Sequence, residues 1–154
     1  MMEEKKRITS EILFAAIEEE LKANRKASFT VTGMSMWPFL CHGRDQVMIE
    51  AVDPQRIQKG DIVLFKVPGD KYILHRVTDI SSDWFETTGD GNLCRDGRFP
   101  YDCLVARVFS VVRKGRTISR DSRSWRWLSS VWMALYPVRK PISRTWLWLR
   151  KYIR

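Results

Sequence analysis

Cysteine is scarce in this 154-residue sequence, and its three cysteines are not spaced as Cys-X-X-Cys. An odd number of cysteines without that spacing argues against a disulfide framework and against a zinc site. It favours a reducing compartment instead. We therefore expect neither a metal ion nor a cofactor.

Long apolar runs are also missing. No stretch reaches the roughly 18 apolar residues that a membrane-spanning helix needs. The first residues, MMEEKKR, are highly charged, and no signal-peptide apolar stretch follows them. We see neither an internal repeat nor a low-complexity segment. From these absences we expect a cytoplasmic protein without a spanning anchor.

Acidic residues almost disappear after residue 115. Residues 116–154 contain 10 Lys and Arg but only one acid, Asp121, whereas residues 1–115 contain 17 residues of each sign. This C-terminal tail therefore carries the whole net charge of +9, and it also holds five of the seven tryptophans.

The apolar pattern predicts a mainly β protein with helices at both ends. Residues 10–24 are expected to form a helix with Ser10 as its N-cap and Asn24 at its end. Its predicted apolar face contains Ile12, Leu13, Ala16, Ile17 and Leu21. Short β-rich runs follow, and DIVLFKV and KYILHRVTDI are expected to form a hairpin through the Pro-Gly-Asp turn at 68–70.

Such strands suggest a twisted sheet or partial barrel. We expect three regions: an N-terminal amphipathic helix (1–27), a β-domain (28–115) and a basic, Trp-rich tail of amphipathic helices (116–154).

Ser35 stands in the apolar stretch TGMSMWPFL. A serine becomes a nucleophile when a base removes its proton and nearby donors stabilise the oxyanion. Gly33 would allow close approach of a substrate, and Pro38 would stiffen the turn. The alternative is an ordinary core serine.

Histidine is even scarcer than cysteine, with two residues, so the choice of a base is narrow. His75 lies in the predicted strand YILHRV, and His42 lies in the polar turn CHGRD, where we expect it to be exposed to solvent. His75 is therefore the candidate base, and a packed histidine on a half-buried strand is the alternative.

Four segments, taken in order, resemble the conserved boxes of type I signal peptidases. They are GMSMWPFL (33–40), KGDIVLF (59–65), HRV (75–77) and TGDGN (88–92). The resemblance is specific because the four boxes occur in the right order over residues 30–96, a little under half of the chain; no single box would suffice. The resemblance implies the signal peptidase-like fold and a serine endopeptidase that cleaves a leader or signal-like peptide after small residues such as Ala.

By this resemblance His75 occupies the position of the general base, as in the Ser-His branch of the superfamily. Lys71 lies four residues too early to match the lysine of the other branch. A histidine base needs an acceptor that orients it. The branch has carboxylates at the positions of Asp90 and Asp96. The match favours Asp96 as the partner of His75 and gives Asp90, like Asp61, a structural role in a turn.

The chain departs from some relatives at Gly33, where they have a hydroxyl two residues before the nucleophile. The oxyanion would then rest on backbone N–H groups, including that of Ser35. We expect Gly33, Met34, Met36 and Pro38 to line a groove for an extended peptide, which would add a strand to a sheet edge.

The tail is the candidate replacement for the membrane anchor of that family. Tryptophan with arginine or lysine suits an anionic membrane surface, so we expect peripheral attachment to the inner membrane face. The candidate residues are Trp125, Trp127, Trp132, Trp146 and Trp148. The alternative is that these helices pack on the β-domain. Without a binding motif, a nucleic-acid partner is not favoured.

Two other functions remain open. The first is a self-cleaving regulator of the LexA group, which shares Gly-Met-Ser-Met, although only about thirty residues precede that box. This is too few for a helix-turn-helix domain. The second is a non-enzymatic, membrane-associated adaptor on a protease fold.

Overall fold

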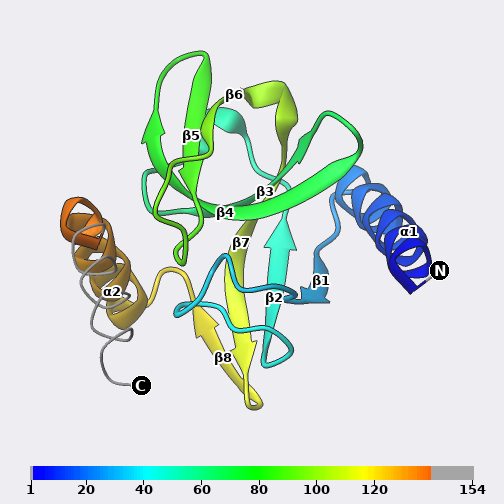
Figure 1. Ribbon diagram of the computed structural model, residues 1–154, viewed down its shortest axis with the longest axis horizontal. Helices are drawn as coiled ribbons and strands as arrows, with labels where there is room; N and C mark the ends of the chain where they lie inside the picture. The colour runs from blue at the N-terminus through cyan, green and yellow to red at the C-terminus, as the bar shows by residue number, and fades with distance from the viewer. Residues whose placement is uncertain (1, 140–154) are drawn as a thin grey trace, which may run out of the picture.

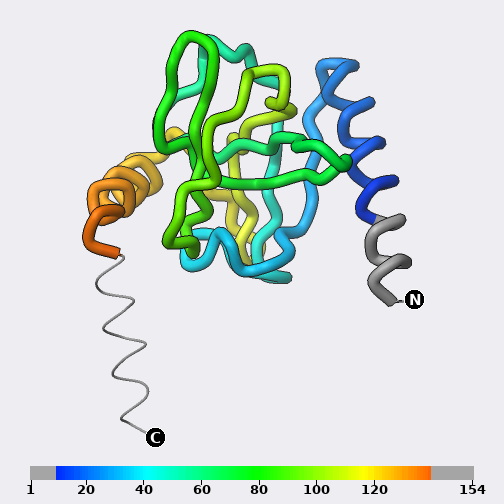
Figure 2. The backbone as a smooth tube through the Cα atoms, turned by 45° about the horizontal axis from the view of Figure 1, so that its top comes forward, coloured from blue at the N-terminus to red at the C-terminus, as the bar shows by residue number. Residues whose placement is uncertain are grey.

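A computed structural model describes the backbone of residues 2–139 and the side chains of residues 10–139. Within this part of the chain the protein is mainly β, with one eight-stranded antiparallel sheet between an N-terminal and a C-terminal helix. The two helices lie on opposite sides of the sheet (Figures 1 and 2).

The sheet has the strand order β1-β2-β7-β3-β4-β5-β6, and β8 pairs with β7 beside this path. The strands are β1 (Ala27–Thr30), β2 (Asp45–Glu50), β3 (Ile62–Val67), β4 (Lys71–Ile80), β5 (Trp84–Thr88), β6 (Gly97–Pro100), β7 (Leu104–Arg113) and β8 (Arg116–Ser119). Two short 3-10 helices, Pro54–Arg56 and Tyr101–Cys103, complete the β-region. The predicted hairpin across residues 68–70 is confirmed by the pairing of β3 with β4.

Helix α1 (Met2–Lys22) begins earlier than predicted, so Ser10 lies inside the helix and does not cap it. The end was predicted correctly. Asn24 has φ +57°, its N–H donates to the carbonyl of Leu21, and the N–H of Arg25 donates to that of Glu20. This pattern is a Schellman cap, which favours a residue that tolerates the left-handed region.

The apolar face of α1 differs from the predicted one. Ile17 and Leu21 are buried in the core, and Phe14 packs against it. Ile12 and Leu13 are exposed, and so is Ala16. The continuous run ILFAAI offers several faces, and contact with the sheet selects the one at 14, 17 and 21.

The predicted boundary at residue 115 falls inside a hairpin. Lys114 and Gly115 both have positive φ, +49° and +75°, and form a two-residue turn between β7 and β8. Such turns suit the twist of paired strands. Residues 116–119 therefore belong to the sheet, and not to a helical tail.

Helix α2 (Arg123–Ala134) begins at Ser122, whose hydroxyl accepts a hydrogen bond from the N–H of Trp125 at 3.3 Å. Residues 136–139 are also helical. In the part of the chain that the structure describes, no helix has the length and apolar character needed to cross a membrane.

The tail tryptophans were predicted to lie at a membrane surface, with packing on the β-domain as the alternative. The structure shows packing for two of them. Trp125 is buried, and its ring meets Phe39 edge-on at 5.9 Å. Trp132 also packs on Phe39, at 5.8 Å, whereas Trp127 is 66% exposed. Burying an indole removes a large apolar area from water, which favours docking of α2 on the core. Trp146 and Trp148 lie outside the described residues.

Candidate active site

Ser35 lies in the loop between β1 and β2, and the loop is held at several points. Gly33 has φ +84°, a conformation that favours glycine, and its N–H donates to Nδ1 of His42 at 3.0 Å. His42 is exposed, as predicted. Its ring accepts a hydrogen bond from the loop, which is a structural contact that the sequence did not indicate.

A second loop, which begins at residue 89 after β5, supports the backbone of Ser35. The N–H of Gly91 donates to the Ser35 carbonyl at 2.8 Å. A Cβ on Gly89 would lie 2.5 Å from the same oxygen, and a Cβ on Gly91 would lie 2.8 Å from the carbonyl oxygen of Met34. The two loops can pack this closely only because both residues are glycine.

His75 lies on β4 and is buried, with 7% of its surface exposed. Its Nδ1 is 2.5 Å from Oδ2 of Asp96. The same carboxylate oxygen accepts a hydrogen bond from Oγ1 of Thr87 at 2.8 Å, and the Asp96 N–H donates to the Thr87 carbonyl at 2.9 Å. Thr87, which the sequence analysis did not single out, thus fixes Asp96 against the His75 ring.

Ser35 and His75 line the same pocket, which has a volume of about 650 Å³. Within the described residues, the Ser35 hydroxyl makes no hydrogen bond to the ring, and the Ser35 N–H has no acceptor. Catalytic hydrogen bonds are often long in proteins without substrate and tighten when it binds. The pocket therefore brings together Ser35 and a histidine whose ring is oriented by a carboxylate.

Only one of the four residues that were predicted to form the groove lines the pocket. Met36 lines the pocket with Ser35, but Gly33, Met34 and Pro38 are not among the described residues that line it. Met34 is 62% exposed. Residues 35–39 form a turn, and neighbouring side chains differ in burial, since Met36 is buried whereas Met34 is exposed.

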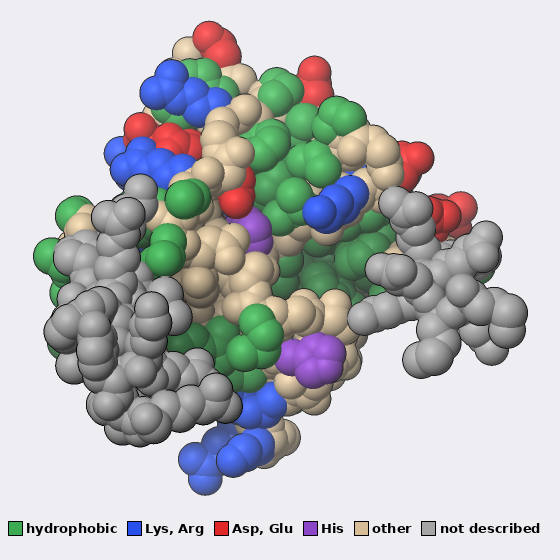
Figure 3. All heavy atoms as spheres, viewed as in Figure 1, with side chains coloured by type: hydrophobic (Ala, Val, Ile, Leu, Met, Phe, Trp, Pro, Cys, Tyr) green, Lys and Arg blue, Asp and Glu red, His purple; other side chains and the backbone are tan. Residues whose placement is uncertain are grey.

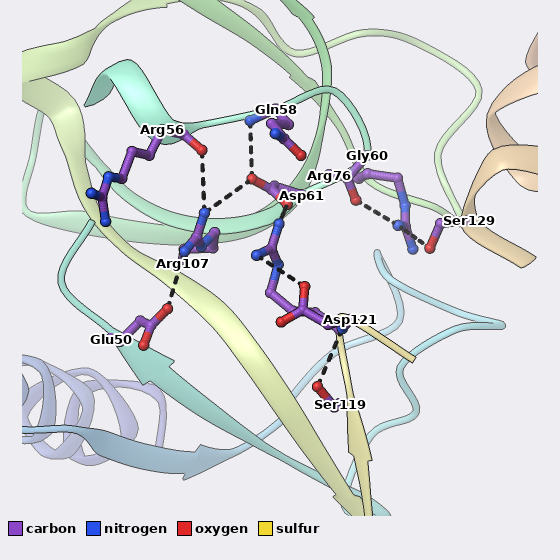
Figure 4. Close-up of polar contacts among 11 residues, drawn as sticks. Glu50, Arg56, Gln58, Gly60, Asp61, Arg76, Arg107, Ser119, Asp121 and Ser129 are labelled. Carbon is purple, nitrogen blue, oxygen red and sulfur yellow. Dashed lines mark hydrogen bonds and ion pairs between the residues drawn. The ribbon is translucent and has the colours of Figure 1, made fainter. Parts of the chain in front are cut away.

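Asp90 contacts Arg76 and not His75. Both Arg76 Nε and Nη2 donate to the Asp90 carboxylate, at 2.8 and 2.7 Å, and both side chains are almost fully buried. Nη1 of Arg76 donates to the Gly60 carbonyl at 2.9 Å and to the Ser129 hydroxyl on α2 at 3.0 Å (Figure 4). Asp90 thus ties its loop to β4.

Asp61 also makes structural contacts (Figure 4). Its carboxylate accepts a hydrogen bond from the Gln58 N–H at 3.0 Å and another from Arg120 at 2.7 Å, and it lies 3.7 Å from Arg107. These contacts hold the start of β3 against β7 and β8.

Residues outside the predicted set shape the pocket. Leu64 and Leu74 line it, and Phe14 and Tyr72 lie in its wall. No group of three or more His, Cys, Asp or Glu side chains in residues 10–139 is placed to hold a metal ion. When the chain was compared with protein-family models, with curated proteins and with solved structures, nothing matched it.

Proposed function

We propose that the protein is a serine endopeptidase of the signal peptidase-like fold, in which Ser35 attacks the peptide carbonyl. The observation that carries the proposal is the contact of Asp96 with Nδ1 of His75, a residue that lines the same pocket as Ser35. An imidazole held in this way by a carboxylate is the arrangement expected of a general base.

The roles follow from which atoms are already engaged. Because Nδ1 of His75 faces Asp96, Nε2 is the nitrogen left to take the proton of Ser35. The Ser35 oxygen then bonds to the carbonyl carbon, and the oxyanion is stabilised by the Ser35 N–H. Protonated His75 gives its proton to the leaving amine, which breaks the peptide bond. Water then hydrolyses the acyl-enzyme through the same base.

The substrate in this proposal is an extended leader or signal-like peptide with a small residue before the scissile bond. Strand β5 pairs with β4 only from Arg76 onward, so in the described chain the outer edge of Lys71–His75 has no strand partner. This edge borders the pocket. Unpaired backbone groups of a strand are suited to bind an extended peptide by strand addition.

We also propose that helix α2 places the enzyme on the cytoplasmic face of an anionic membrane. Four apolar side chains on α2 and directly after it are exposed: Trp127, Leu128, Val131 and Leu135. Arg123 and Arg126 are exposed on the same helix. Apolar side chains and cations together favour the membrane interface.

The test is cleavage of peptides that contain Ala before the scissile bond. We expect the protein to cleave them, Ser35→Ala to abolish cleavage, and Ser82→Ala, a change at an exposed serine in the β4–β5 turn, to have no effect. If Ser35→Ala cleaves as the parent protein does, the nucleophile assignment is wrong. Sedimentation with anionic vesicles, comparing Trp127→Ala with the parent protein, tests the membrane proposal separately.

A further inference from the structure

Helix α1 forms one end of the pocket that contains Ser35 and His75. Ser10, Glu11 and Phe14 of α1 line the pocket together with Phe29 of β1 and Tyr72 of β4. Apolar side chains gather over β4 and beside α1 (Figure 3). In Figure 1, α1 lies next to the turn between β3 and β4.

Phe14 connects the two strands that border this end. Its ring stacks on Tyr72, with centroids 4.5 Å apart and planes 15° apart. It meets Phe29 edge-on at 5.4 Å. Aromatic contacts of this geometry stabilise a fixed arrangement beyond simple burial. The Phe14 ring therefore bridges β1 and β4 within the wall of the pocket.

The helix is anchored so that the ring stays in place. The Tyr72 hydroxyl donates a hydrogen bond to Glu18, one turn after Phe14. Burial and this bond to Glu18 raise the pKa of Tyr72. Ile17 and Leu21 on the same face are buried in the core. Displacing Phe14 would require these contacts to break as well.

The distance along β4 from His75 to the Phe14 ring can be counted in residues. Tyr72, on which the Phe14 ring stacks, lies three residues before His75 on β4. At about 3.3 Å per residue, this is about 10 Å of strand. A peptide added along the edge has the same rise, so about three of its residues fit between the reacting bond and Phe14.

We propose that Phe14 closes the substrate groove and limits it to about three residues on one side of the scissile bond. This inference rests on the proposed peptidase function and adds a length limit set by α1. A large side chain at the fourth position on that side meets the Phe14 ring, so a longer substrate must turn out of the groove there.

The test uses two sets of alanine-rich peptides, lengthened by one residue at a time on either side of the scissile bond, with Trp at the fourth position. Two readouts are measured: kcat/KM for the parent protein, and the affinity of the Ser35→Ala variant for the same peptides. In one set we expect the fourth-position Trp to weaken both by about tenfold or more, as a poorly fitting side chain does. Phe14→Ala should remove the penalty.

Leu13→Ala is the matched control, because Leu13 is the neighbouring residue on α1 but is 44% exposed. It should keep the parent length profile. If Phe14→Ala folds poorly, Phe14→Leu keeps an apolar side chain and should relieve the penalty in part. Thermal unfolding of each variant shows whether its fold is intact.

The outcomes separate this inference from the proposed function. Cleavage with identical length profiles in the parent and Phe14 variants overturns the inference and leaves the peptidase standing. A Phe14-dependent length limit in binding, without cleavage, supports the groove closure and overturns the catalytic proposal. If peptides are neither cleaved nor bound, both are wrong.

Discussion

The ion pair between Arg76 and Asp90 should be essential for stability. Arg76 is 1% exposed and donates four hydrogen bonds: two to Asp90, one to Gly60 and one to Ser129. Its guanidinium also lies 4.6 Å from the centre of the Phe39 ring. Arg76→Met keeps the approximate volume but leaves the Asp90 carboxylate buried without its cation.

The size of the effect follows from that uncompensated charge. Removing one partner of a buried pair costs about 3–5 kcal/mol, and a domain of this size is stable by about 5–15 kcal/mol. Arg76→Met should therefore remove a large share of the free energy of unfolding, and Asp90→Asn should do the same. The double variant has no unpaired buried charge, so it should cost clearly less than the sum of the two single changes.

The assay is urea denaturation at pH 7 of the parent, the two single variants and the double variant. A matched control is Arg25→Met, because Arg25 makes the same two-pronged contact with Glu20, at 2.6 and 2.9 Å, on the exposed surface. It should shift the urea midpoint little, since exposed pairs are screened by water and salt. If Arg76→Met behaves like Arg25→Met, or the two single losses are additive, the reasoning is wrong.

Three further predictions concern the site and its support. Asp96→Asn should lower kcat/KM by about 10²- to 10⁴-fold with little change in KM, because it removes the carboxylate that orients His75; steady-state kinetics check this, and an equal loss in Ser82→Ala would contradict it. Gly89→Ala places a Cβ 2.5 Å from the Ser35 carbonyl oxygen, so thermal unfolding should show about 1–3 kcal/mol of destabilisation, and activity should fall. Burial alone would raise the pKa of Asp45, but hydrogen bonds from Arg44 and Arg113 outweigh it and hold the pKa well below its usual range. The stability that Asp45 contributes is therefore complete above about pH 3.9 and is lost as the pH falls through the lower folded pKa. Asp45→Asn should destabilise the protein at pH 7 and do so less at pH 2 in denaturant titrations, and an equal loss at both values would contradict the assignment.

Local sequence patterns were sufficient to predict several elements of the fold. The run KYILHRVTDI and the turn before it correctly placed the β3–β4 hairpin, because β-rich residues and a Pro-Gly-Asp turn are local signals. The end of α1 at Asn24 was also a local signal. The face of α1 was not, because the run ILFAAI is apolar on several sides and only tertiary packing selects Phe14.

The composition change after residue 115 was misleading as a structural boundary. Charge and tryptophan content change there, but the backbone continues into β8 through the Lys114-Gly115 turn. Trp125 was expected at a membrane surface because cations surround it in sequence. Its spacing of four from Ser129 places both on the face that α2 buries, and both are buried.

Ser35 and His75 were candidates from the residues themselves, because few histidines were available as a base. The resemblance of several boxes then supported both and added Asp96. The structure brings His75 into contact with Asp96 and places Ser35 in the same pocket as His75. Thr87 and the close approach of Gly89 to Ser35 could not be predicted, because they arise where separate loops pack together.

The most direct measurement of the central claim is labelling by a serine-directed phosphonate, followed by peptide mapping in a mass spectrometer. If Ser35 is activated by His75, the adduct forms on Ser35, and His75→Ala slows its formation strongly while Ser82→Ala does not. An adduct on another serine, or equal labelling of Ser35 in the His75→Ala variant, would contradict the assignment of nucleophile and base.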